Sequence, residues 1–336
     1  MNRISHEPSE NSRKRIAVIT LLFGVLILIF KFWAYNLTGS QAVFSDAVES
    51  IINVMTAVSL IITMIIAARP PDEDHPYGHG KVEFFSAAFE GGLITFASVV
   101  IVIEALQSFT REHRVENFDL GQTIVLFAAV LNFALGLYLY RSGKREDSLA
   151  MMASGKHLMS DFWTSLAVLG ALFLVKWTNH FWIDPVMALA AAAYLGYSGV
   201  TILIKSTQGL MDAEDDKTLK RILKSFTKNW FPGIIRIHHL RVMRAGNFHH
   251  IDAHVVVPEF WDVKTSHEHT HFFEEKFFED YDNPGELHLH IDPCRRAYCD
   301  VCDLKECPVR ERPFTEKIPF TLEELKSPIE PKEYRP

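Results

Sequence analysis

The segment Ser45-Asp46-Ala47-Val48-Glu49-Ser50-Ile51-Ile52-Asn53 lies inside a long apolar run, and a later apolar run contains His157-Leu158-Met159-Ser160-Asp161. Glu49 and Asn53 are four residues apart, as are His157 and Asp161, so each pair projects from one face of a helix. An ionisable group at the centre of a bilayer costs about 2.5 kcal/mol or more, and such groups normally face the interior of a helix bundle. We therefore interpret these four residues as one metal site inside a membrane domain.

The composition of the 336 residues fits a membrane domain joined to a soluble domain. Apolar residues make up 48% of the chain, yet charged residues still make up 22%. The net charge of -7 provides no general basic surface, which argues against nucleic-acid binding. The sequence contains no nucleotide-binding glycine loop, so we expect an ion gradient rather than ATP to drive the protein, and we do not expect an enzyme.

Six apolar segments are each long enough to provide the ~20 residues that cross a hydrocarbon core. They cover residues 16–37, 41–68, 84–110, 120–140, 149–175 and 181–204. Lys and Arg gather before the first segment, in the loops 69–81 and 141–145, and after the sixth segment. The alternate loops hold only Arg111 and Arg114, with Lys31 and Lys176 flanking them. This bias predicts that both termini are cytoplasmic.

The loop between the second and third segments, residues 70–83, is rich in proline and glycine and is expected to be shaped rather than helical. His75 and His79 are four residues apart, and Asp72 precedes them. Imidazole nitrogen with carboxylate oxygen suits zinc and similar divalent ions. A solvated turn has the same composition, so the residues alone leave both interpretations open.

The soluble part begins near residue 209 and reads as α-β-β-α-β. The expected elements are residues 213–230, 237–243, 248–257, 262–281 and 286–292. In the second and third strands, apolar residues alternate with His and Asp, so one face is apolar and the other presents metal ligands. Ten of the sixteen histidines lie between His238 and His290, which favours metal binding over chance surface histidines.

All four cysteines follow the last strand with the spacing C-x4-C-x2-C-x4-C. They are Cys294, Cys299, Cys302 and Cys307. Four thiolates form a closed metal site in many proteins, but four reduced surface thiols fit the same spacing. The Pro- and charge-rich remainder to residue 336 predicts a poorly packed tail.

The motifs at Ser45–Asn53, His75–Lys81 and His157–Asp161 together resemble the cation diffusion facilitator family, and the resemblance covers most of the chain. It implies a homodimer that exports a divalent cation from the cytoplasm in exchange for protons. The implied fold is an α-helical membrane protein with six transmembrane helices and a C-terminal cytoplasmic α/β domain of the ferredoxin-like, metallochaperone-like type. The expected divisions are 1–15 (cytoplasmic segment), 16–208 (membrane domain), 209–293 (metal-binding domain) and 294–336 (Cys-rich tail).

The resemblance also implies roles for individual residues. Glu49, Asn53, His157 and Asp161 would form a tetrahedral transport site, and Asp72, His75 and His79 a second site that faces the cytoplasm. Lys81 would pair with Asp212, and the cytoplasmic ligands would be His238, His254, His267, His290 and Asp292. Zinc-transporting relatives usually carry Asp or His, then Asp, where this chain has Glu49 and Asn53. Because a neutral amide suits manganese or iron about as well as zinc, we expect zinc with iron, manganese or cobalt as alternatives.

Three further expectations follow. The chain should be a multi-pass protein of a cell membrane, here a bacterial inner membrane, in contact with lipid. His157 should couple transport to protons, because its unperturbed pKa of about 6.5 lies near physiological pH. Asp46 is either an outer way-station for ions or a polar group near a helix start. The competing interpretation of the whole chain is a non-transporting paralogue that acts as a metal-responsive scaffold.

Overall fold

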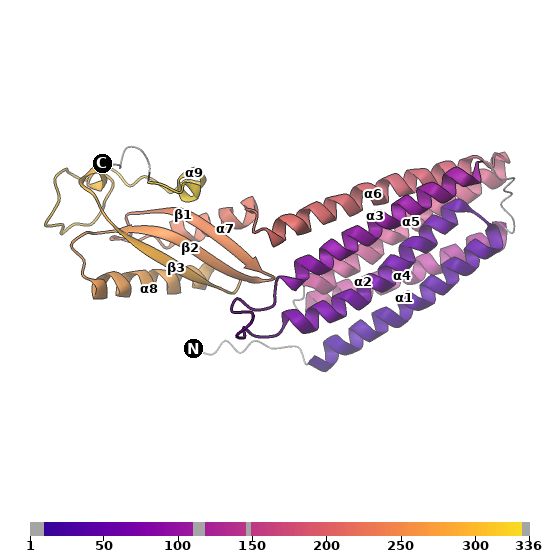
Figure 1. Ribbon diagram of the computed structural model, residues 1–336, viewed down its shortest axis with the longest axis horizontal. Helices are drawn as coiled ribbons and strands as arrows, with labels where there is room; N and C mark the ends of the chain where they lie inside the picture. The colour runs from indigo at the N-terminus through magenta and orange to yellow at the C-terminus, as the bar shows by residue number, and fades with distance from the viewer. Residues whose placement is uncertain (1–9, 110–117, 146–148, 331–336) are drawn as a thin grey trace. The chain divides into compact units, whose positions relative to one another are not determined.

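The computed structural model describes residues 10–109, 118–145 and 149–330 (Figure 1). His157 belongs to a helix, but its side chain lies outside what the structure describes. The chain divides into two compact units, which we treat separately. One comprises residues 1–65 with 84–207, and the other comprises residues 66–83 with 208–336. The loop that carries Asp72, His75 and His79 therefore belongs to the same unit as the soluble domain.

The six expected apolar helices are present, and each is long and apolar enough to cross a membrane. They are α1 (Glu10–Thr38), α2 (Gln41–Ala67), α3 (Val82–Ser108), α4 (Phe118–Arg145), α5 (Leu149–Thr178) and α6 (Ile183–Leu210). Helices α4 and α6 extend five to six residues beyond the expected ends, because their polar C-terminal residues continue the helix after the apolar run stops. The fold class expected from the sequence is confirmed for this part.

The start of α2 is fixed by a buried carboxylate from α6. Gly39 has φ +63°, which ends α1 and turns the chain directly into α2. Asp184 then accepts hydrogen bonds from Oγ of Ser40 and the backbone N–H of Gln41, both at 2.5 Å. A negative charge at a helix N-terminus is favourable, so this contact sets the position of the helix that carries Glu49 and Asn53.

Close packing of α4 against α5 positions the other polar pair. At Gly155 of α5, an added Cβ would lie 2.5 Å from the backbone nitrogen of Tyr140 in α4. Only glycine permits this approach of the two backbones. Gly155 lies two residues before His157 and six before Asp161. It therefore brings the part of α5 that carries this pair close to α4.

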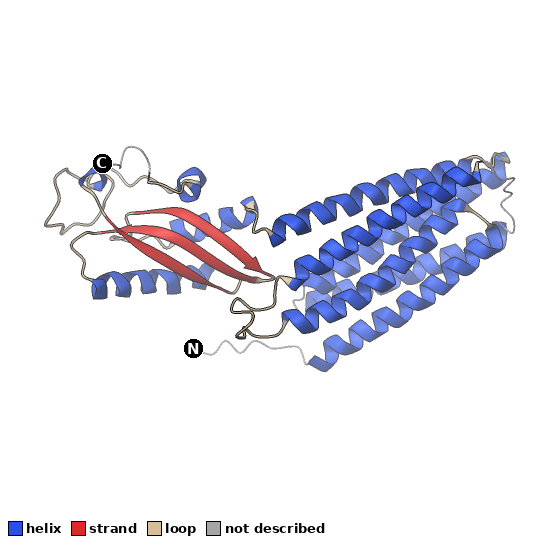
Figure 2. Ribbon diagram, viewed as in Figure 1, coloured by secondary structure: helices blue, strands red, loops and turns tan. Residues whose placement is uncertain are grey.

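The second unit has the expected order α7 (Asp216–Lys228), β1 (Arg236–Ala245), β2 (Phe248–Val257), α8 (Val263–Asp280) and β3 (Gly285–Pro293). The sheet order is β1-β2-β3, with an antiparallel first pair and a parallel second pair (Figure 2). Apolar side chains of α7 and α8, including Phe226 and Phe273, form one core with Ile237, Ile251 and Val255 of the sheet. The alternation that predicted the strands therefore identified the buried face of β2.

The prediction of a poorly packed tail after Cys307 was wrong for residues 308–330. The segment after β3 forms the short 3-10 helix η1 (Arg296–Tyr298), and the tail then forms helix α9 (Leu322–Lys326). Leu325 is fully buried in the core of the unit. Glu324 forms a buried ion pair with Arg236 of β1, and the guanidinium also donates to the carbonyl of Ile318 at 2.6 Å. Charged residues that suggested a solvated segment are thus paired inside the fold.

Candidate metal sites

The first candidate site joins the polar pairs of α2 and α5. Nδ2 of Asn53 donates to Oδ2 of Asp161 at 2.6 Å, so the two helices meet at these residues. One turn earlier in α2, Oε2 of Glu49 accepts from Oγ1 of Thr164 at 3.4 Å. Glu49 and Asp161 are both buried. Three of the four residues expected at this site therefore lie at one helix interface, and the backbone of His157 lies one turn before Asp161.

A buried ion pair lies beside this site. Lys31 of α1 is completely buried, and its Nζ is 2.8 Å from Oδ1 of Asp46 in α2. Oγ of Ser165 in α5 donates to the same oxygen at 2.8 Å. The expectation that Lys31 lies beside a loop at the membrane surface was therefore wrong. Its side chain is a cation buried between helices. Neither interpretation of Asp46 anticipated this partner.

A cavity opens next to the ion pair and the polar site. Its volume is about 230 Å³, and its lining includes Ser45, Asp46, Glu49, Thr164 and Tyr194. Most of the remaining wall is apolar, contributed by α2, α5 and α6. A cavity of this size holds several water molecules, so it provides room for a hydrated ion beside the carboxylate of Glu49.

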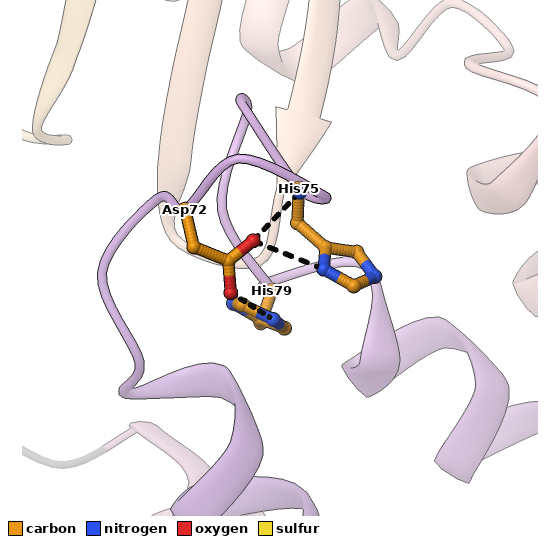
Figure 3. Close-up of side chains that lie close together, drawn as sticks. All are labelled: Asp72, His75 and His79. Atoms are coloured by element: carbon orange, nitrogen blue, oxygen red, sulfur yellow. Dashed lines mark hydrogen bonds and ion pairs between the residues drawn. The ribbon is translucent and has the colours of Figure 1, made fainter.

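The loop histidines form the second candidate site (Figure 3). Oδ1 of Asp72 accepts from the backbone N–H of His75 at 2.7 Å and lies 3.2 Å from Nδ1 of that ring. Oδ2 of Asp72 lies 3.4 Å from Nε2 of His79. The hydrogen bond from the His75 backbone lowers the pKa of Asp72, which keeps the carboxylate ionised as a metal ligand must be. One ligand atom from each of the three residues lies within 4.8 Å of the others.

The loop is held against the hairpin formed by β1 and β2. An added Cβ at Gly80 would lie 2.1 Å from the carbonyl oxygen of Ala245, so the glycine permits direct backbone contact. The ring of Tyr77 stands edge-on to His250, with centroids 5.1 Å apart. Nζ of Lys81 lies 2.8 Å from Oδ2 of Asp212, the pairing that the family resemblance implied.

The third candidate site lies on the sheet. Oδ2 of Asp292 in β3 is 2.9 Å from Nδ1 of His254 in β2 and 3.7 Å from Nε2 of His238 in β1. Burial lowers the pKa of His238, which favours the neutral imidazole that binds metal. Nε2 of His290 is 3.6 Å from Oδ1 of Asp292 and its ring contacts His254. His267 is an exposed residue of α8 that stacks on His271, so the structure does not bring it to this group.

The four cysteines are all free thiols. Cys299 and Cys302 are buried, and Cys294 and Cys307 are partly buried. Burial raises the pKa of Cys294 and Cys302, which disfavours thiolates in the absence of metal. Within the described residues, the two groups of three ligand-type side chains that lie close together are the loop group and the sheet group, and neither contains a cysteine.

Sequence comparisons agree with this architecture. Residues 17–211 match the family model described as the cation efflux transmembrane domain, and residues 214–294 match the cation efflux protein cytoplasmic domain.

Three bacterial relatives extend over most of the chain. An uncharacterized transporter of Synechocystis, sll1263, is 33% identical over 75% of this chain and 81% of its own length. The manganese efflux system protein MneP of Bacillus subtilis is 27% identical over 84% of this chain and 97% of its own. The cation-efflux pump FieF of Shewanella oneidensis is 27% identical over 84% and 93%. With its six spans and its cytoplasmic α/β domain, the chain therefore belongs to the cation diffusion facilitator family of cation efflux transporters, which are not enzymes.

Proposed function

We propose that this protein exports a divalent metal cation from the cytoplasm in exchange for protons, through a site formed by Glu49, Asn53, His157 and Asp161. The observation that carries the proposal is the 2.6 Å contact between Asn53 and Asp161, which joins the two intramembrane motifs. Two buried carboxylates, an amide and an imidazole would give the four ligands of a tetrahedral site with a formal charge that balances one divalent ion.

The proposed cargo is a first-row divalent ion. Oxygen ligands from Glu49, Asn53 and Asp161 outnumber the single imidazole nitrogen, which suits manganese and iron(II) as well as zinc and cobalt. The name of the Bacillus subtilis relative supports including manganese. Measuring the transport preference among these four ions would identify the cargo.

Proton exchange is proposed at the same residues. Metal binding needs the neutral imidazole of His157, and a proton that reaches the site when it faces outward competes for the ligand nitrogen. Asp161, one turn along the same helix, then stabilises the imidazolium after the metal leaves. An inward proton gradient would drive metal efflux as the site alternates between the two sides of the membrane.

The remaining assignments extend this proposal. We place both termini in the cytoplasm of a bacterial cell, with the membrane domain at residues 16–208, the metal-binding domain at 209–293 and the Cys-rich segment at 294–336. The protein would be a homodimer in the inner membrane. Two groups would sense cytoplasmic metal: Asp72 with His75 and His79, and His238 with His254, His290 and Asp292. His267 would act only if another copy of the chain supplied it, and Cys294, Cys299, Cys302 and Cys307 would close on metal only after rearrangement.

Transport in proteoliposomes tests the proposal. Purified protein is reconstituted with an imposed pH gradient, and the flux of zinc, manganese, iron(II) and cobalt is measured separately. Asp161→Asn should abolish flux of every ion while the protein still inserts, because it removes a charged ligand. Glu268→Gln, a change at an exposed carboxylate of α8, is the matched control and should transport normally. Undiminished flux in Asp161→Asn would refute the site, and no flux in the unmodified protein would favour the scaffold interpretation.

A further inference from the structure

We propose that His239 is a metal ligand, and that a divalent cation binds between Nδ1 of His239 and Nε2 of His254 on the cytoplasmic sheet. This residue was not among the candidates from the sequence, since the family resemblance implied His238 and not His239. Neighbouring residues of a regular strand also point to opposite faces, so the two histidines would not be expected to share a site. The structure shows that β1 is not regular at this point.

The strand is irregular where the two histidines meet. The register between β1 and β2 shifts between His238 and Arg241, and His239 has φ +53°, a conformation that residues other than glycine seldom adopt. As a result, both imidazoles approach the same ring. The centroid of His254 lies 5.1 Å from that of His238 and 4.7 Å from that of His239. Strained backbone of this kind is concentrated at functional sites.

The hydrogen bonds determine which nitrogen of His254 is available. Oδ2 of Asp292 lies 2.9 Å from Nδ1 of His254. An ionised carboxylate only accepts, so Nδ1 carries the proton and Nε2 of a neutral His254 keeps its lone pair. That lone pair faces Nδ1 of His239 at 3.1 Å. Two nitrogens bound to one tetrahedral zinc at about 2.0 Å are separated by about 3.3 Å, so the present spacing is close to that of a shared ion.

The carboxylate behind His254 supports the same interpretation. Histidines that bind metal commonly donate their other N–H to a carboxylate, which fixes the tautomer and the orientation of the ring. Asp292 already makes this contact. A neutral His239 that binds metal through Nδ1 carries its proton on Nε2. Within the described part of the chain, that Nε2 atom is buried and has no hydrogen-bond partner.

The C-terminal segment maintains the unusual backbone at His239. The N–H of His239 donates to the carbonyl of Ser327 at 2.9 Å. Next to this contact lies a cleft of about 600 Å³. Its lining includes His238, His254 and Asp292, together with the residues that follow Ser327, which are Pro328, Ile329 and Glu330. The segment therefore keeps the backbone of His239 in place, and the cleft gives solvent access to His254 beside it.

The proposed ligand is a borderline divalent cation such as zinc, since imidazole ligands favour zinc, cobalt(II) and nickel over magnesium or calcium. The inference concerns binding at the cytoplasmic centre and rests only on the part of the proposed function that assigns metal to His254 and Asp292. It does not depend on the intramembrane site.

The experiment uses the full-length protein in detergent, with zinc affinity measured by competition and cobalt(II) binding followed by visible absorption. The informative variant is His239→Gly, because glycine adopts a positive φ without strain. We expect a higher thermal midpoint of the metal-free protein, together with about a tenfold or greater loss of zinc affinity at the cytoplasmic centre and a weaker cobalt spectrum. His288→Gly, at an exposed histidine of β3, is the control and should leave the zinc affinity and cobalt spectrum unchanged.

The possible results distinguish a failure of the role of His239 from a failure of the whole cytoplasmic metal centre. A higher midpoint with unchanged zinc affinity and cobalt spectrum would show that His239 is only a turn residue, which overturns the inference. If His254→Gln loses metal while His239→Gly does not, the cytoplasmic centre stands and His239 is excluded from it. If neither variant changes metal binding, the proposed cytoplasmic centre fails as well. An equal loss in His288→Gly would also overturn the specific role of His239.

Discussion

Replacing Asn53 with aspartate is the most direct probe of the intramembrane site. The amide of Asn53 now donates to Oδ2 of Asp161 at 2.6 Å, so one neutral group faces one carboxylate. Asn53→Asp removes this donor and places two carboxylates against each other with almost no change in size. Their mutual repulsion is relieved only by a cation or by a proton.

The size of the effect follows from the contact distance. With the charge centres of the two carboxylates about 4 Å apart and an effective dielectric constant of about 20, the repulsion is about 4 kcal/mol, or roughly three orders of magnitude in a binding constant. Uptake of a proton relieves part of that repulsion in the metal-free protein. We therefore expect divalent ions to bind about 10- to 100-fold more tightly, with the largest gain for zinc, and release to be slower.

The assay is competitive metal titration of full-length protein, with transport in proteoliposomes measured in parallel. His79→Ala is introduced into both the parent and the Asn53→Asp protein. It removes a ligand of the loop site from both, so that the intramembrane site dominates the difference in affinity. Asn53→Ser serves as a neutral control, which should weaken binding. If Asn53→Asp changes affinity less than about twofold and leaves the order of metals unaltered, Asn53 does not contact the ion.

Three other predictions concern buried ionisable groups. Asp46→Asn leaves the ammonium of Lys31 buried without its charged partner and should destabilise the protein by about 3–5 kcal/mol. Adding Lys31→Met should restore most of the thermal midpoint in detergent, and equal midpoints for the single and double variants would contradict this. Glu324→Gln should similarly destabilise the cytoplasmic unit by about 3 kcal/mol by isolating the buried Arg236, and Arg236→Met with Glu324→Leu should recover most of that loss in limited proteolysis. Burial lowers the pKa of His249 to about 4, so between about pH 6.5 and 4 the unfolded chain binds more protons at this ring than the folded chain, and stability falls as the pH decreases. His249→Gln should make the thermal midpoint depend less on pH between pH 7.5 and 5, and an unchanged slope would count against this role.

Some of the site could be predicted because it depends on local spacing. The four-residue separation of Glu49 from Asn53 and of His157 from Asp161 places each pair on one helix face whatever the rest of the fold does. That the two faces meet is a tertiary fact, visible in the contact of Asn53 with Asp161. The group of Asp72, His75 and His79 could also be predicted from the sequence, since the three residues are close neighbours in the chain.

The sequence by itself determined the six membrane spans and the α-β-β-α-β order, because the length of an apolar run and the period of its polar residues are local properties that the backbone geometry must obey. Only the tertiary structure decided which charges are internal. Lys31 pairs with Asp46 from another helix, and Arg236 pairs with Glu324 from a tail that was expected to be poorly packed. Likewise, the irregular strand turns His239 toward His254 against the regular alternation of a strand. Such pairings depend on which segments pack together, and a charge has no periodic signature that reveals its distant partner.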